Sequence, residues 1–210
     1  MKYLVIGGSG FIGTHLIKKL ISEDHNVVNF DLENSTIEQI ETIKGDIKIR
    51  ADLDRVNANI DCVYILAAVH RDDIRNHYKY YETNCEGLNN IIDFSNTKNI
   101  KKIIYYSTAA VYGDSFVNAK EDDKLCPESH YGKSKAKAEE FLKKWASGIG
   151  KKLLIIRPSV VYGVGSNSNM NRLINYVVDN KLVSDLEDDD GHKYLYIDLD
   201  LCIDLVLYVS

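Results

Sequence analysis

The sequence predicts an α/β fold built on a doubly wound parallel sheet. Short apolar runs alternate with amphipathic stretches along most of the 210 residues, which is typical of strands wrapped by helices. A glycine-rich turn follows the first apolar run directly, as in a strand–turn–helix unit. The chain has no internal repeat and no low-complexity linker, so neither a repeat protein nor a disordered chain is expected.

Six short, β-rich runs are predicted to be the strands of that sheet. In chain order they are residues 2–6, 26–30, 42–47, 61–66, 102–106 and 152–156. The fourth run is almost continuously apolar, which indicates a strand buried on both faces. Helices are predicted between and after these runs, over residues 11–21, 73–94, 129–147 and 170–178.

Composition and charge exclude several classes of protein. The chain is 45% apolar and 27% charged, with a net charge of −5 and no basic stripe, so binding to nucleic acid is not expected. Its apolar runs are too short to span a membrane, so we expect no signal peptide, no membrane anchor and a cytoplasmic location. The four cysteines are widely separated, and the acidic run 187–190 is interpreted as a solvated loop, so no metal site is predicted.

The glycine turn has the spacing of a dinucleotide-binding motif. Gly7 permits a tight turn out of the strand, Gly10 lets the backbone approach a pyrophosphate, and Gly13 allows close packing of the helix. The first helical turn, which contains Phe11 and Ile12, then offers free backbone amides to the phosphates. These five residues are therefore predicted to bind a dinucleotide cofactor.

Asp31 directly follows the second predicted strand, where a carboxylate can accept hydrogen bonds from an adenosine ribose and repel the extra phosphate of NADP. Leu32 and Glu33 follow it, so no basic residue is nearby to bind that phosphate. The sequence therefore predicts NAD as the cofactor and a Rossmann-type sheet that holds it.

Tyr131 and Lys135 lie four residues apart in a predicted helix, so they share one face of it. A phenol with a pKa of about 10 is almost fully protonated at neutral pH, so a tyrosine that acts as a base needs a fixed positive charge beside it. Lys135 is placed to supply that charge. Tyrosine and lysine pairs without a catalytic role, on exposed helices, have the same spacing. The glycine turn and the hydroxyls of Ser107 and Thr108 favour the catalytic interpretation here.

Together these segments resemble the NAD-dependent epimerase/dehydratase family of extended short-chain dehydrogenases/reductases, from residue 1 to about residue 200. The resemblance implies that Tyr131 is the general base, that Lys135 is its partner and that Thr108 supplies the catalytic hydroxyl. It also implies cofactor contacts at further positions that match the family's segments. These are Asp46, Ile47, Leu66, Ala67, Ala68, Asn84, Ser107, Tyr131, Lys135 and Pro158.

The residues after Thr108 narrow the reaction that the resemblance implies. Related dehydratases carry an acid and a base there, whereas this chain has Ala109 and Ala110. We therefore expect an NAD-dependent epimerase that acts on a nucleotide sugar by transient hydride transfer, with Tyr131 as the general base. A reductase or dehydrogenase of the same fold and a non-catalytic NAD-binding protein stay open as alternatives.

Two regions are predicted along the chain. Residues 1–165 form the NAD-binding Rossmann domain, and residues 166–210 form part of a substrate-binding region that is truncated relative to the family, so the C-terminal substrate domain is expected to be incomplete. Residues 194–198 resemble a strand that lies partway through the family's C-terminal domain. The helices over 73–94 and 129–147 resemble a pair that commonly forms a dimer face, which favours a homodimer.

Overall fold

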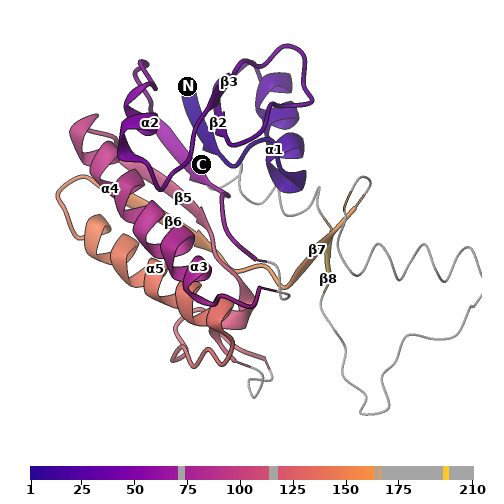
Figure 1. The fold of residues 1–210 in the computed structure, drawn as a ribbon, viewed down its shortest axis with the longest axis vertical. Coiled ribbons are helices and arrows are strands. Elements are labelled where there is room, and N and C mark those ends of the chain that lie inside the picture. Colours follow the sequence, from indigo (N-terminus) through magenta and orange to yellow (C-terminus); the bar gives the residue numbers. More distant parts are fainter. Residues whose placement is uncertain (71–73, 114–117, 164–165, 167–195, 199–210) are drawn as a thin grey trace, which may run out of the picture. The chain divides into compact units, whose positions relative to one another are not determined.

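The chain divides into two compact units, Met1–Arg157 and Pro158–Ser210, in a computed structural model (Figure 1). The structure describes residues 1–70, 74–113, 118–163, 166 and 196–198. The predicted helix over 170–178 and the acidic run 187–190 lie outside these residues. The domain boundary expected after residue 165 stays a prediction.

All six strands of the first unit are parallel, in the order β3-β2-β1-β4-β5-β6. Their bounds are Lys2–Ile6 for β1, Asn26–Asp31 for β2, Thr42–Lys44 for β3, Cys62–Ile65 for β4, Lys102–Tyr106 for β5 and Lys152–Ile156 for β6. The strand order reverses between β1 and β4, and sheets of this type bind ligands at the carboxyl edge beside such a reversal. The observed order confirms the predicted doubly wound Rossmann-type sheet.

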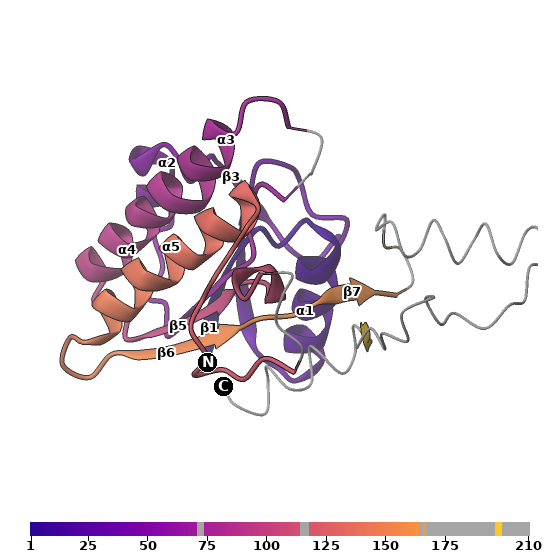
Figure 2. The ribbon, with the colours of Figure 1, turned by 90° about the horizontal axis from the view of Figure 1, so that it is seen from below.

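Helices cover both faces of the sheet. Figure 2 shows α1 on one face and α2, α3, α4 and α5 on the other. Their bounds are Phe11–Ser22 for α1, Arg50–Asp54 for α2, Tyr78–Tyr81 for α3, Leu88–Thr97 for α4 and His130–Ala146 for α5. A π turn, η1 (Glu82–Gly87), joins α3 to α4, and a 3₁₀ turn, η2 (Ala109–Val111), follows β5.

The main core lies between the sheet and the layer of α2, α4 and α5. It is formed by buried aliphatic and aromatic side chains, among them Leu4, Ile6, Phe30, Leu53, Val63, Ile65, Ile91, Phe94, Ile103, Leu142 and Trp145. On the opposite face, α1 buries Leu16, Ile17 and Leu20. Burial of this apolar area is the main favourable term in folding, and it fixes the carboxyl edge of the sheet as a rigid platform.

The helical segment predicted over 73–94 begins later and ends later in the structure. The side chain of Asn76 accepts the backbone amide of Tyr78 at 3.2 Å, and α3 begins there. The chain then continues through η1 and α4, which ends at Thr97, and Asn99 follows with the left-handed φ of 55°. Asparagine adopts this conformation more readily than most residues. The helix therefore ends within a polar stretch, where the composition of the sequence does not mark the boundary.

The strand predicted over 42–47 ends at Lys44. The backbone amide of Asp46 donates to the Asp52 carboxylate at 2.9 Å, and the chain turns into the short helix α2, which was not predicted from the sequence. Gly45 is needed at this turn, because a Cβ there would lie 2.6 Å from the ring of Phe30.

In the second unit, β7 (Val160–Tyr162) pairs in parallel with β8 (Tyr196–Asp198). The strand β8 falls within the segment 194–198, whose sequence resembles a C-terminal strand of the family. Among the helices of the described residues, none is long and apolar enough to cross a membrane.

Candidate cofactor and catalytic site

The glycine turn lies against the end of the neighbouring strand β4. Gly7 has a φ of 87°, and a Cβ there would lie 2.5 Å from the Ala67 backbone nitrogen. A Cβ on Gly13 would lie 2.5 Å from the Gly7 carbonyl oxygen, so α1 packs on the turn with no room for a side chain. The backbone amides of Leu66 and Ala67 both donate to the Ile6 carbonyl, at 2.8 and 3.0 Å. The predicted segments at the ends of β1 and β4 are therefore in contact.

The start of α1 is available to an anion. Gly10 is its N-cap and supplies no side-chain hydrogen bond to the helix. The amides of Phe11, Ile12 and Gly13 have no acceptor within the helix, because they belong to its first turn. Free amides and the helix dipole both favour a phosphate at this position. The start of α1 is therefore compatible with the pyrophosphate of a dinucleotide, and the predicted contacts at these residues stay a prediction.

Asp31 is held at the end of β2 by the backbone. Its two carboxylate oxygens accept the amides of Ser9, at 2.9 Å, and Glu33, at 3.1 Å. A carboxylate has about four acceptor positions, so Asp31 keeps lone pairs for a ribose hydroxyl. The glycine turn and the ribose-binding candidate are therefore joined by a direct hydrogen bond.

Asn29 is a buried polar residue beneath the turn that was not predicted from the sequence. Its Nδ2 donates to the hydroxyls of Ser9 at 3.0 Å and Thr42 at 2.8 Å, and Thr42 in turn accepts the Ser35 amide at 2.9 Å. The signal in the sequence was an asparagine inside an otherwise apolar strand. It ties the turn, β2 and β3 together below the cofactor position.

Asp46 and Ile47, which the family resemblance implies as cofactor contacts near the adenine, have other partners in the structure. Ile47 is only 6% exposed and packs in the core, where Gly87 leaves room for its side chain. Asp46 is engaged locally, since it accepts the Lys48 amide at 2.9 Å and lies 3.6 Å from the Lys48 ammonium. The part that these two residues play toward the adenine stays a prediction.

Asn84 lies in the π turn η1 and is almost completely buried. Its Oδ1 accepts the Val69 amide at 2.9 Å, and its Nδ2 donates to the Val69 carbonyl at 3.0 Å and to the Ser134 hydroxyl at 2.9 Å. Both amide hydrogens are therefore used within the protein. Asn84 fixes the segment after β4, which contains Ala68, and the predicted direct contact with the cofactor stays untested.

Lys135 is buried, with 2% of its surface exposed. Its ammonium donates to the Tyr106 carbonyl and lies 4.2 Å from the centroid of the Tyr105 ring. Burial lowers the pKa of Lys135 to about 7, while the charges of Glu139 and Cys85 act in the opposite direction. The ammonium is thus anchored at the carboxyl end of β5, inside the protein and not on its surface.

Tyr131 lies in the first turn of α5, one turn before Lys135, and is partly exposed. Its ring is 6.3 Å from that of Tyr80. Ser129 caps the helix by accepting the Gly132 amide at 3.0 Å, and Gly132 lets α5 approach η2, since a Cβ there would lie 2.6 Å from the Ala110 carbonyl. Helix α5 therefore begins directly against the segment that follows β5.

Ser107 and Thr108 lie where that segment leaves β5, and both are buried. The Thr108 hydroxyl accepts the Ala110 amide at 3.2 Å, as the cap of η2. The Ser107 hydroxyl points elsewhere and donates to the Glu139 carboxylate at 2.6 Å. Thr108 thus lies two residues after the Tyr106 carbonyl that holds Lys135. Pro158 opens the second unit, and its cofactor contact stays a prediction.

The comparisons with known proteins identify the family. A sequence model of the NAD dependent epimerase/dehydratase family matches residues 3–191. The chain belongs to this family. Membership in the epimerase/dehydratase family confirms the predicted resemblance and the predicted cofactor, NAD.

Individual members of the family show how this chain compares. It is 37% identical over 182 residues to an N-acetyl-alpha-D-glucosaminyl-diphospho-ditrans,octacis-undecaprenol 4-epimerase of Escherichia coli O157:H7, which covers 86% of this chain and 55% of that protein. It is 31% identical to a UDP-glucose 4-epimerase of Lacticaseibacillus casei, over 75% of this chain and 50% of that protein. The chain therefore spans about half the length of these relatives.

A solved structure of similar fold is the UDP-glucose 4-epimerase of Thermus thermophilus in complex with NAD. It superposes with a TM-score of 0.86 at 22% identity and covers all of this chain and 74% of that one. A UDP-glucuronic acid 4-epimerase from Bacillus cereus, also in complex with NAD, gives a TM-score of 0.85 at 25% identity. These similarities confirm that this member of the epimerase/dehydratase family has the α/β fold predicted from its sequence.

Proposed function

We propose that this chain carries the catalytic half of an NAD-dependent epimerase that acts on a sugar linked to a diphosphate. The observation that carries the proposal is the position of Lys135. A buried ammonium anchored at the end of β5, one helical turn after Tyr131, is a costly arrangement that an ordinary surface pair does not need. Its family membership and the 4-epimerases among its relatives support the same reaction.

Each of the three proposed catalytic residues has a chemical task. Tyr131 removes the proton from the reacting sugar hydroxyl, and the charge of Lys135 favours the phenolate that this requires. Thr108 hydrogen-bonds the same oxygen and keeps it in line with the phenol. NAD, when bound, would supply the redox chemistry, by accepting a hydride from the sugar carbon and returning it to the opposite face.

Epimerisation is favoured over dehydration because no acid–base pair follows Thr108. The next residues are Ala109 and Ala110, which form the start of η2 and carry no titratable group. A reductase or dehydrogenase of the same fold would instead consume or release reduced cofactor in each turnover. The stoichiometry of NAD therefore separates these two reactions.

The relatives differ in the group to which the sugar of their substrate is linked. The relative that is 37% identical acts, by its name, on a sugar linked through diphosphate to undecaprenol, whereas the UDP-glucose 4-epimerases act on a UDP-sugar. A diphosphate is common to both substrates, and we propose that it is the feature bound. We favour the nucleotide sugar that the sequence predicted, and the lipid-linked sugar is the second candidate.

The test incubates the protein and NAD with UDP-glucose, UDP-N-acetylglucosamine or N-acetylglucosaminyl-diphospho-undecaprenol. Product configuration at C4 is followed by NMR, and absorbance at the NADH band is followed in parallel. We expect epimerisation without accumulation of NADH. Stoichiometric NADH would identify a dehydrogenase, and binding of NAD without conversion of any substrate would identify a non-catalytic protein.

The matched variants are Tyr131→Phe and Tyr78→Phe. The first removes the proposed base and should lower turnover by about 100-fold or more, the usual contribution of general base catalysis. The second removes the hydroxyl of an exposed tyrosine on α3 and should leave turnover unchanged. Full activity of Tyr131→Phe would falsify the proposed mechanism.

A further inference from the structure

Helix α5 carries a carboxylate in the protein interior, one turn after Lys135. Glu139 has no exposed surface, although a buried charge is costly unless it is paired and hydrogen-bonded. Tyr131, Lys135 and Glu139 follow one another at intervals of four residues, so they lie along one face of the helix. The proposed mechanism uses the first two and leaves Glu139 without a role.

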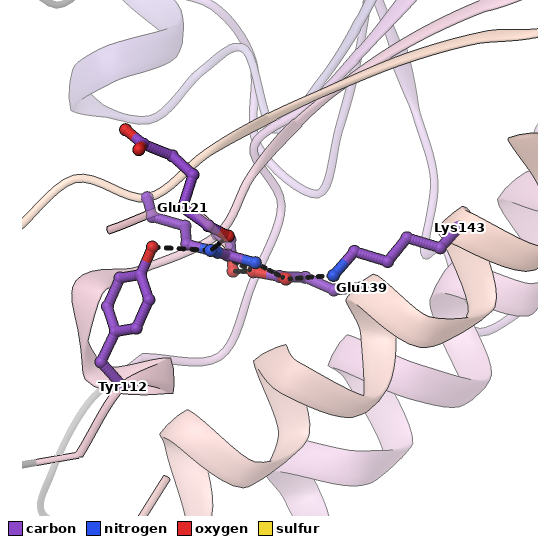
Figure 3. Close-up of polar contacts among 6 residues, drawn as sticks. Tyr112, Glu121, Glu139 and Lys143 are labelled. Carbon is purple, nitrogen blue, oxygen red and sulfur yellow. Dashed lines mark hydrogen bonds and ion pairs between the residues drawn. The ribbon is translucent and has the colours of Figure 1, made fainter. Parts of the chain in front are cut away.

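The Glu139 carboxylate has three partners, Arg157, Ser107 and Lys143, and Figure 3 labels Glu139 and Lys143. Arg157 donates from Nε at 2.9 Å and from Nη2 at 2.6 Å, which is the bidentate geometry that arginine makes with carboxylates. The Ser107 hydroxyl donates at 2.6 Å, and the Lys143 ammonium lies 3.6 Å away. Burial acts to raise the pKa of Glu139, but the hydrogen bonds from Arg157 and Ser107 outweigh it and keep that pKa below its usual value.

Arg157 is itself fixed by two further contacts. Its Nη1 donates to the Tyr112 hydroxyl at 2.6 Å and to the Glu121 carbonyl at 3.0 Å (Figure 3). The guanidinium also lies 5.0 Å from the centroid of the Tyr112 ring. Glu139 therefore joins α5 to the residue after β6 and to the segment after β5 through one connected network.

Two successive turns of α5 hold the segment that contains Thr108. Lys135 donates to the Tyr106 carbonyl, and Glu139 accepts from the Ser107 hydroxyl. Thr108 is the next residue, and Tyr131 lies one turn before Lys135. The two hydrogen bonds thus set how α5 lies along residues 106–108, which also sets how the phenol lies relative to the threonine hydroxyl.

We propose that Glu139, clamped by Arg157, is a positioning residue that acts through Ser107 and Lys135 to align Tyr131 with Thr108. This inference rests on the proposed function, because it assigns Glu139 to that reaction. A buried ion pair is by itself weak support for stability, since desolvation offsets most of the attraction. Its presence beside the site is explained by alignment of the catalytic residues, because an error of about 1 Å in such a site can cost about 100-fold in rate.

The mildest test is Ser107→Ala, which removes the link between α5 and residues 106–108 but leaves the Glu139–Arg157 pair intact. We expect kcat to fall about 10-fold or more while the Kd for NAD stays within about twofold. A rise in the Kd for NAD with kcat unchanged would instead make Ser107 a direct cofactor contact and overturn the inference.

The second variant is Glu139→Gln, with Glu140→Gln as its control on the exposed face of the same helix. We expect a loss of kcat in the first and none in the second, and partial rescue by Glu139→Asp, which restores the charge. The double variant Ser107→Ala/Glu139→Gln should be no slower than Glu139→Gln alone, because both changes break one path. Additive losses would contradict a shared path. If Glu139→Gln does not fold, Ser107→Ala decides the question.

A readout that needs no turnover separates this inference from the proposed function. The groups that face Lys135 are Glu139 on its own helix, Cys85 on η1, and Tyr105 with the Tyr106 carbonyl on β5. Titration of the Lys135 ammonium by ¹⁵N NMR should give a midpoint of about 7 in the wild type and a lower one in Glu139→Gln. An unmoved midpoint in an active enzyme would overturn the inference and leave the proposed function standing, whereas an inactive wild type would overturn the proposed function and, with it, the role of Glu139 in that reaction.

Discussion

The side-chain amide of Asn84 pairs with the backbone of Val69 in both directions. Its Oδ1 accepts the Val69 amide, and its Nδ2 donates to the Val69 carbonyl. A third hydrogen bond reaches the Ser134 hydroxyl on α5. One buried side chain therefore joins η1, the segment after β4 and the helix that carries Tyr131.

Asn84→Ala should lower the free energy of unfolding by about 2–4 kcal/mol, because it leaves several buried polar groups without partners. Urea denaturation followed by circular dichroism measures this change. Asn89→Ala, on an exposed position of α4, is the control and should change stability by less than about 0.5 kcal/mol. Equal free energies of unfolding for the two variants would show that the contacts of Asn84 with Val69 do not stabilise the fold.

The second prediction concerns the glycine turn and its effect on stability and NAD binding. Gly7→Ala combines a left-handed φ of 87° with a Cβ only 2.5 Å from the Ala67 nitrogen, so it should cost about 3 kcal/mol or more and abolish NAD binding. Gly150→Ala has a similar φ of 71° but open space around it, so only the backbone strain of about 1–2 kcal/mol should remain. Thermal unfolding and NAD titration compare them. Similar effects in both would mean that the contact with Ala67 is unimportant.

Asp31 should determine the preference for NAD over NADP. Asp31→Asn removes a charged acceptor for the ribose hydroxyls, so the Kd for NAD should rise about 10–100-fold. Binding of NADP should change less, because the repulsion of its extra phosphate is lost at the same time. Glu33→Gln, which changes an exposed carboxylate two residues later, is the control and should leave both constants unaltered. An unchanged ratio of the two constants in Asp31→Asn would count against this role.

Burial of Lys135 should make the stability of the protein increase with pH above neutrality. Its folded pKa of about 7 lies below its ordinary value of 10.5, so between these values the unfolded chain binds more protons than the folded one. The free energy of unfolding should therefore rise with pH from about 7 to 9, by up to about 1.4 kcal/mol per unit. Between a pH of about 9 and 10.5 the slope should flatten, because burial raises the pKa of the Cys62 thiol to about 12 and its contribution opposes that of Lys135.

Urea denaturation at a series of pH values between about 7 and 9 measures this slope. Lys135→Met is the comparison, since it keeps a long side chain in the core without a titrating group. Its stability should be flatter over the same range. A wild type and a variant with parallel curves would show that Lys135 does not titrate in that range.

The sequence alone predicted the parallel sheet and several strand bounds because those signals are local. The runs 2–6, 102–106 and 152–156 match β1, β5 and β6 at both ends. Buried parallel strands are short, apolar and β-rich, so their ends coincide with a change of composition. Helix α2 and the π turn η1 were missed, because a turn of helix stabilised by tertiary contacts has little pattern of its own.

Part of the candidate site was equally predictable. The glycine spacing, Asp31 and the pair Tyr131 and Lys135 follow from local motifs. Glu139 and Asn29 were not found, because their function depends on partners far along the chain, which spacing in one segment does not reveal. Glu139 at four residues after Lys135 was the available signal, and only the structure shows that Arg157 and Ser107 meet it in the interior.

Arg157 also has a practical consequence for protein engineering. It follows the last residue of β6 and ends the first compact unit, yet it supplies the counter-charge for a fully buried carboxylate. A minimal expression fragment for crystallisation that stopped at residue 156 would contain every strand of the six-stranded sheet and still leave Glu139 without its bidentate partner. The shortest fragment worth making therefore ends after Arg157. A single terminal residue decides whether the buried carboxylate on helix α5 has its counter-charge.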